Sequence, residues 1–219
     1  RWEKIKSLYS YAGYNSPSIE IKTKKISENS FDVLIEIDRG NKTKIKSVNF
    51  VGNKKISNRR LKDVIASEED KFWKVLSRNT NFTESLLELD TRLLRNFYKS
   101  SGFYDIKINS KFAKITDSDE AELSFFIDEG TRYTINKIST NVDSVFDKDL
   151  FFPMEKIYSK YLGDYYSPFK IKKLLDNLDK LIEKNNLQFV EHNVEEVIEG
   201  DSINVILNVY EGEKKLVER

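Results

Sequence analysis

The sequence predicts an α+β fold made of tandem β-α-α-β-β modules, each a three-stranded mixed sheet covered on one face by two helices. The first observation is a repeated strand ending: "FDVLIEIDRG" at 31–40, "AELSFFIDEG" at 121–130 and "INVILNVYEG" at 203–212. The second is that a strand-like run precedes each ending and is joined to it by a short polar turn, which is typical of a β-hairpin. The third is a helical pattern of apolar residues before the last two hairpins. Self-similarity at a nearly constant period indicates repeated structural units.

The repeat divides the chain into three parts. We expect 1–40 to be the C-terminal half of a module, a helix and a β-hairpin, and 41–130 and 131–219 to be complete modules. Short strands, "NKTKIKSVNFVGN" and "TRYTINKISTNV", open the two complete units. The first residues, "RWEKIKSLYSYAGY", already have a helical pattern and lack the basic and apolar pattern of a leader. We therefore expect the chain to be a piece of a longer protein, with any targeting segment outside it.

Residues that favour the N-cap position predict where the helices begin. Ser57 or Asn58 is expected to cap the first helix of the middle module. A second helix is expected over about 83–101, with Thr83 as its cap. In the last module Ser167 is expected to cap a helix that has Pro168 at its first position.

The helix ends share a turn. "LLRNFYKSSGFYDIKI" and "IKSLYSYAGYNSPSIEI" place Gly102 and Gly13 where a helix must turn sharply into a strand. A left-handed residue ends a helix most easily as Gly. Asn185 and Asn186 take this place in the last unit, which the same rule tolerates. Around the middle turn we expect four aromatic residues to clamp helix to strand as part of the core: Phe97, Tyr98, Phe103 and Tyr104.

Composition excludes several kinds of site. The 219 residues include 37 basic and 36 acidic ones, a balance that gives no global field to attract nucleic acid. With no Cys, disulfides, thiolate chemistry and Cys-based zinc sites are excluded. The single histidine, His192, lies among strand carboxylates, and we expect it to be solvated. No catalytic or nucleotide-binding motif is present, so we expect no enzyme, no metal and no cofactor.

Three motifs together carry a family resemblance. The helix-terminal turn "YKSSGFYD", the last strand ending "DEG" and the next strand "IKSVNFVGN" resemble POTRA domains, the periplasmic modules in front of the outer-membrane barrel of BamA-type assembly proteins. The resemblance covers essentially the whole chain. The stretch "DKFWKVLSRNTNFTESLLELDTRLLRNFYKSSGFYDIKI" looks like a third POTRA domain, so the expected order is the end of POTRA 2, POTRA 3 and POTRA 4. The last unit departs from the pattern with "STNVDSVFD" where "xGN" is usual.

The resemblance implies a non-enzymatic periplasmic scaffold, anchored in the outer membrane of a Gram-negative bacterium. Such a scaffold is expected to bind unfolded outer-membrane β-barrel proteins by strand addition and to dock accessory assembly lipoproteins. Its own C-terminal barrel would lie outside this chain. Two alternatives remain open: the POTRA arm of a related translocation or secretion transporter (TamA or two-partner secretion type), or a structural POTRA-like module of another envelope protein.

The residues themselves point to sheet edges as binding sites. The last strand of each unit is apolar enough to be central, whereas the strand before it carries lysines, a usual device that keeps an edge from aggregating. An edge so protected still accepts an extended partner through its backbone, and the alternative is a merely solvated edge. The expected edge residues of the middle module are Ile106, Lys107, Ile108, Asn109, Ser110, Lys111, Phe112, Ala113 and Lys114. Those of the N-terminal hairpin are Ile19, Glu20, Ile21, Lys22, Thr23, Lys24 and Lys25.

Two further sets of residues are expected to have a functional role. Phe72 and Trp73 lie between the two helices of the middle module, where they would anchor a partner or plug the end of a small core. The short connections between units are expected to act as hinges that set the shape of the arm. The hinge residues are Asp38, Arg39, Gly40, Asn41, Asp128, Glu129, Gly130 and Thr131.

Overall fold

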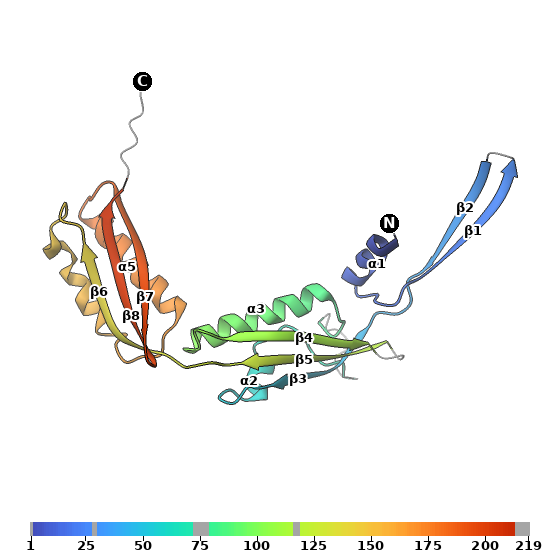
Figure 1. The fold of residues 1–219 in the computed structure, drawn as a ribbon, viewed down its shortest axis with the longest axis horizontal. Helices are drawn as coiled ribbons and strands as arrows, with labels where there is room; N and C mark the ends of the chain where they lie inside the picture. Colours follow the sequence, from blue (N-terminus) through green and yellow to red (C-terminus); the bar gives the residue numbers. More distant parts are fainter. Residues whose placement is uncertain (1, 28–29, 72–78, 116–118, 213–219) are drawn as a thin grey trace, which may run out of the picture. The chain divides into compact units, whose positions relative to one another are not determined.

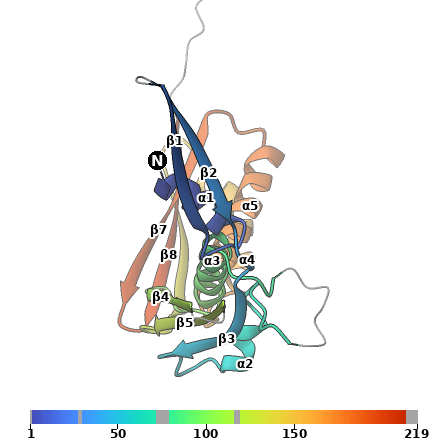
Figure 2. The same ribbon diagram turned by 90° about the vertical axis from the view of Figure 1, so that its right-hand side faces the viewer.

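A computed structural model describes residues 2–27, 30–71, 79–115 and 119–212 (Figures 1 and 2). The chain forms two compact units. The first comprises Arg1–Arg95 with Lys107–Asp128, and the second comprises Asn96–Ile106 with Glu129–Arg219.

The first unit contains a hairpin and a three-stranded sheet. In the hairpin, strands β1 and β2 pair antiparallel. In the sheet the order is β3-β5-β4, with β5 parallel to β3 and antiparallel to β4. The elements are α1 (Trp2–Tyr11), β1 (Ser18–Ser27), β2 (Ser30–Asp38), β3 (Lys44–Val51), α2 (Asn58–Lys62), β4 (Lys107–Ile115) and β5 (Glu120–Asp128), with α3 (Glu84–Ser100) running from this unit into the second. Figure 1 shows α3 along one face of this sheet.

The second unit repeats the topology. Its sheet has the order β6-β8-β7. The central strand β8 is parallel to β6 and antiparallel to β7. Its elements are β6 (Thr134–Val142), the 3₁₀ helix η1 (Lys148–Met154), α4 (Glu155–Tyr158), α5 (Pro168–Lys184), β7 (Val190–Glu199) and β8 (Ser202–Glu211). The predicted α+β class with mixed three-stranded sheets is confirmed, and the closing strands β5 and β8 are central as expected, whereas β2 pairs only with β1 among the described residues.

The two cores follow from strand alternation. Every second residue of β5 is buried, and Phe125 stacks on Phe50 of β3 with ring centroids 5.6 Å apart. The opposite face of β5 is open, and Phe126 is 41% exposed there. The buried residues of β8 repeat the pattern: Ile203, Val205, Leu207 and Val209. One buried face on each of these two sheets leaves the opposite face to solvent.

The expected caps are mostly present. The side chain of Ser57 accepts a hydrogen bond from the Arg60 amide, and that of Thr83 accepts one from Leu86 at 3.1 Å. Ser167 occupies the cap position before Pro168 with extended backbone, but its side chain makes no capping bond. For Ser167 the predicted side-chain cap is therefore wrong, since Pro168 at the first position already fixes the backbone for helix entry.

The helix-ending turns are left-handed. The φ angle is +90° at Gly13, +98° at Gly102 and +52° at Asn186, as the sequence predicts. At the middle turn Tyr98 and Phe103 are buried and meet edge to face with ring centroids 5.3 Å apart. The predicted aromatic clamp is confirmed for these two residues, whereas their neighbours Phe97 and Tyr104 are only half-buried.

Candidate functional site

The edge of the middle sheet formed by β3 is occupied by its own chain. The amide of Ile45 donates to the carbonyl of Thr80 at 2.8 Å, and the carbonyl of Ile45 accepts from the amide of Asp70 at 2.7 Å. Lys44 and Asn81 form an antiparallel bridge at the start of the strand. The first outward backbone groups of β3 therefore already have partners.

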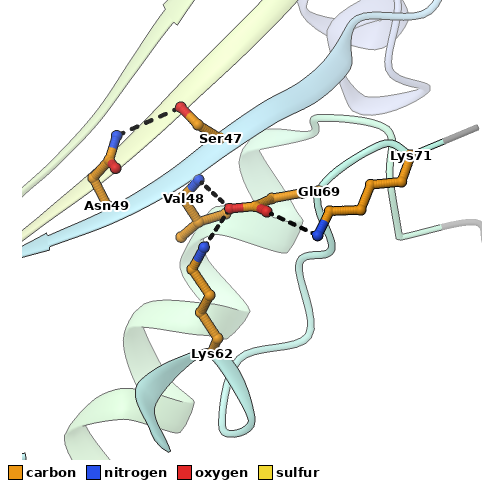
Figure 3. Close-up of polar contacts among 6 residues, drawn as sticks. All are labelled: Ser47, Val48, Asn49, Lys62, Glu69 and Lys71. Atoms are coloured by element: carbon orange, nitrogen blue, oxygen red, sulfur yellow. Dashed lines mark hydrogen bonds and ion pairs between the residues drawn. The ribbon is translucent and has the colours of Figure 1, made fainter. Parts of the chain in front are cut away.

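A side chain closes the next position along β3. The carboxylate of Glu69 accepts a hydrogen bond from the backbone amide of Val48 at 3.2 Å, and it also pairs with the ammonium groups of Lys62 and Lys71 (Figure 3). Burial opposes the ionisation of Glu69 most strongly, but the hydrogen bonds from Lys62 and Val48 and the charges of Lys62 and Lys71 together outweigh it. The pKa of Glu69 consequently lies below its usual value. The charged carboxylate thus blocks the β3 edge against another strand.

The β4 edge of the same sheet differs. Strand β5 pairs with one side of β4, and within the described ranges no strand pairs with its other side. Of the residues expected at this edge, all but one lie in β4. Ile106 lies just before the strand with its side chain buried, and its amide donates to the carbonyl of Phe103.

A β-bulge interrupts β4. Ile108 pairs with Ile127 and Ser110 pairs with Phe126, so Asn109 is an extra residue that has no pairing partner on β5. A bulge shifts every following side chain to the other face of a strand. Lys111 therefore lies opposite buried Phe125, on the face covered by helix. A bulge at this position is also a common protection of an edge.

A groove runs between this edge and helix α3. Its volume is about 550 Å³, and its lining includes Ile108, Asn109 and Lys111 from β4 and Glu88, Arg92 and Arg95 from α3. Lys111 reaches across to Glu88, with Nζ and Oε1 3.5 Å apart. An extended chain added to β4 would lie along this groove, because an added strand continues the sheet at the edge.

The second predicted edge belongs to the hairpin of β1 and β2. Lys22 of β1 pairs with Glu36 of β2, with Nζ and Oε2 2.5 Å apart. Apolar side chains of both strands are exposed, including Ile21 at 48% and Val33 at 58%. The stretch from Ile19 to Lys25 lies within β1, in a two-stranded sheet. Its use as a binding edge stays a prediction.

The predicted hinge residues lie beside a repeated backbone contact. The amide of Thr43 donates to the carbonyl of Gly13 at 3.0 Å, and the amide of Tyr133 donates to the carbonyl of Gly102 at 2.8 Å. In both cases the acceptor is the glycine that ends a helix, and the donor opens the next strand. The hinge role of the connections stays a prediction.

Individual hinge side chains have structural partners. Asp38 accepts a hydrogen bond from the amide of Gly40, and Arg39 lies over the ring of Tyr14 at 5.2 Å from its centroid. Glu129 is buried and accepts a hydrogen bond from the hydroxyl of Tyr98 at 3.1 Å. Burial, followed by the charge of Glu129, raises the pKa of Tyr98.

Two other expectations concern single side chains. Phe72 and Trp73 lie outside the described residues. His192 is not simply solvated, which corrects the prediction: its Nε2 atom lies 2.7 Å from Oδ1 of Asp179. The partner comes from α5, whereas the sequence only showed the carboxylates on the histidine's own strand. The parts of the chain that the structure describes hold no group of three or more side chains able to bind a metal ion.

Comparison with known proteins finds a family match for part of the chain and relatives for most of it. Residues 43–130 match the family model POTRA, described as the surface antigen variable number repeat. The BamA outer membrane protein assembly factor of Neisseria meningitidis serogroup B is 24% identical over 209 residues, which cover 93% of this chain and 26% of that protein. The BamA of Neorickettsia risticii is 29% identical over 135 residues, covering 62% of this chain and 18% of that protein. The chain thus spans about a quarter or less of the length of these relatives.

Solved structures agree on the fold. The structure of Haemophilus ducreyi BamA lacking POTRA domains 1–3 has a TM-score of 0.54 at 14% identity, covering 77% of this chain and 29% of that one. POTRA domains 1–2 of the periplasmic domain of Omp85 from Anabaena have a TM-score of 0.51 at 13% identity, covering 78% of this chain and 96% of that one.

These findings confirm the expected resemblance. Residues 43–130 match the POTRA family model, and BamA proteins are similar to this chain across most of its length. The Anabaena structure is described as part of the periplasmic domain of Omp85, the compartment that the resemblance implies for this chain. Among the described residues, no helix is both long and apolar enough to cross a membrane.

Proposed function

We propose that this chain belongs to the periplasmic arm of an outer-membrane protein assembly factor and that its β4 edge binds unfolded outer-membrane β-barrel proteins by strand addition. The observation that carries the proposal is the difference between the two edges of one sheet. The β3 edge is closed from Lys44 to Val48 by backbone contacts and by Glu69, whereas the β4 edge has no strand beyond it in the described residues and borders a groove.

Strand addition suits such clients physically. The backbone of the added segment supplies the hydrogen bonds, so affinity depends little on its exact sequence. Side chains of the segment alternate between the two faces of the sheet, so every second side chain contacts the same face of the module. Segments that alternate between apolar and polar residues, as transmembrane β-strands do, fit this arrangement.

The remaining parts of the arm are proposed on the family relationship. We take the modules to be 1–40, 41–130 and 131–219, each acting as a binding scaffold with no catalytic role. Accessory lipoproteins would dock on the module surfaces, and the chain's own C-terminal barrel would hold the arm at the outer membrane. The names of the relatives as assembly factors support this assignment.

A peptide titration tests the proposal. The ¹⁵N-labelled chain is titrated with a ten-residue, end-blocked peptide of alternating apolar and polar residues, and amide shifts are mapped. Two matched peptides are N-methylated at alternate residues, one set on each backbone edge of the peptide. We expect shifts in β4 with the unmethylated peptide and with one methylated form only. Equal shifts with both methylated forms, or no shifts in β4, would overturn strand addition.

A further inference from the structure

We propose that the groove between α3 and β4 selects extended segments with Glu or Asp at alternate positions. This inference rests on the proposed function, because it assumes that a strand adds to β4. It concerns which segments the edge prefers.

Two cations on α3 have no partner among the residues that the structure describes. Arg92 and Arg95 are exposed and line the groove, and neither makes an ion pair or hydrogen bond through its side chain within the described residues. Lys111, on the opposite wall, is already paired with Glu88. The groove therefore has three cations and one carboxylate along its walls, and the two guanidinium groups are its free charges.

The spacing of the two arginines fits an added strand. Residues three apart on a helix lie on one face, about 4.5 Å apart along the axis. Residues two apart on a strand lie on one face, about 6.7 Å apart. The long arginine side chains span the difference, so one guanidinium can meet each of two alternate carboxylates. Guanidinium forms paired, charge-assisted hydrogen bonds with carboxylate.

The combination of backbone and charge defines the ligand as a peptide segment. A free anion or a lipid headgroup would use the cations but not the backbone groups of β4. A C-terminal carboxylate supplies charge at one point only and would occupy one of the two arginines. Acidic side chains at alternate positions of an extended segment use both arginines and the edge at once.

The test uses the 219-residue chain and three ten-residue peptides. The first has Glu at alternate positions and blocked ends, the second has Gln in place of Glu with blocked ends, and the third is the Gln peptide with a free C-terminus. Binding is measured by fluorescence anisotropy, and its location by amide shifts. The variants are R92Q/R95Q and, as a control with a charge change in the same module, R59Q, since Arg59 lies on α2 and not in the groove.

We expect the Glu peptide to bind about tenfold more tightly than the Gln peptide at low salt, an amount that two partly shielded ion pairs provide. R92Q/R95Q removes this advantage and leaves Gln-peptide binding unchanged, whereas R59Q changes neither. Equal binding of the blocked peptides with shifts in β4 would overturn the selection and keep strand addition. A preference for the free C-terminus alone would also overturn it. No shifts in β4 with any peptide would overturn the proposed function itself.

Discussion

Helices α3 and α5 share one framework and differ in charge at two matched positions. Helix α3 ends before left-handed Gly102 and helix α5 before left-handed Asn186. Counted back from these residues, fully buried Leu94 corresponds to fully buried Leu178. The same count places Asp176 and Asp179 of α5 where α3 has its two free arginines, Arg92 and Arg95.

The edge strands of the two sheets also differ in the sign of their charged residues. Strand β4 has three lysines in its sequence, and β7 has four glutamates: Glu191, Glu195, Glu196 and Glu199. Topology makes both strands edges, since each pairs on one side with a central strand. Charge, which the fold does not fix, then decides what each edge attracts. One fold can in this way give successive modules different partners.

The largest expected effect concerns the cores of the two modules. Asp90 of α3 is fully buried where α5 has Leu174. Its Oδ1 atom accepts hydrogen bonds from the amides of Ala66 at 2.7 Å and Ser67 at 3.2 Å. D90L, which copies the other module, leaves these amides unsatisfied and should lower the free energy of unfolding by about 2–4 kcal/mol. Urea denaturation measures it.

An exposed position on the same helix serves as the control. R92L should change the free energy of unfolding by about 0.5 kcal/mol or less. If D90L were as stable as wild type, the hydrogen bonds of Asp90 to the two amides would not contribute to the free energy of unfolding.

The next effect concerns the charge of the groove between α3 and β4. R92D/R95D gives α3 the charges of α5, so the preference for a Glu peptide should be lost and a Lys peptide of the same spacing should bind about tenfold more tightly than to wild type. Fluorescence anisotropy at low and high salt measures both. An unchanged preference in the double variant would show that the groove charges do not select the partner.

A smaller effect tests the closed edge. E69A removes the acceptor of the Val48 amide and the partner of Lys62 and Lys71. We expect amide exchange at Val48 to accelerate about tenfold, because a weak hydrogen bond of about 1.4 kcal/mol is lost. E88A, which removes the Lys111 pair on the other side of the module, should leave Val48 unchanged. Unaltered exchange in E69A would mean that the carboxylate does not close the β3 edge.

The smallest effect depends on pH. The pKa of Glu69 is depressed in the folded chain from its usual value near 4.5. Its contribution to stability is therefore fully present above about pH 4.5 and is lost as pH falls through the depressed value. Between pH 6 and pH 3 the wild-type chain should lose more stability than E69A, as measured by urea denaturation at each pH. Parallel curves for the two chains would contradict the assignment.

Sequence patterns predict the features that are local or periodic. The central strands, the glycine turns at Gly13 and Gly102, and the caps at Ser57 and Thr83 all depend on neighbours along the chain. The mixed-sheet fold follows from the repeat of these local signals.

Features that depend on distant contacts were missed. The bulge at Asn109 has no compositional signal, since it depends on the register with β5. Glu69 closes β3 from a loop, so its role depends on how that loop returns to the sheet. Asp179 reaches His192 only because α5 packs beside β7. Each of these joins segments that lie far apart in the sequence or in different elements, which periodicity does not describe.

Site-resolved amide exchange, with and without the end-blocked strand peptide, tests the central claim most directly. In the free chain, the amides of Ile45 and Val48 should be protected and the outward amides of β4 should exchange quickly. With saturating peptide, β4 should gain protection and β3 should not change. Protection gained on β3, or none gained on β4, would contradict the account of one closed and one open edge.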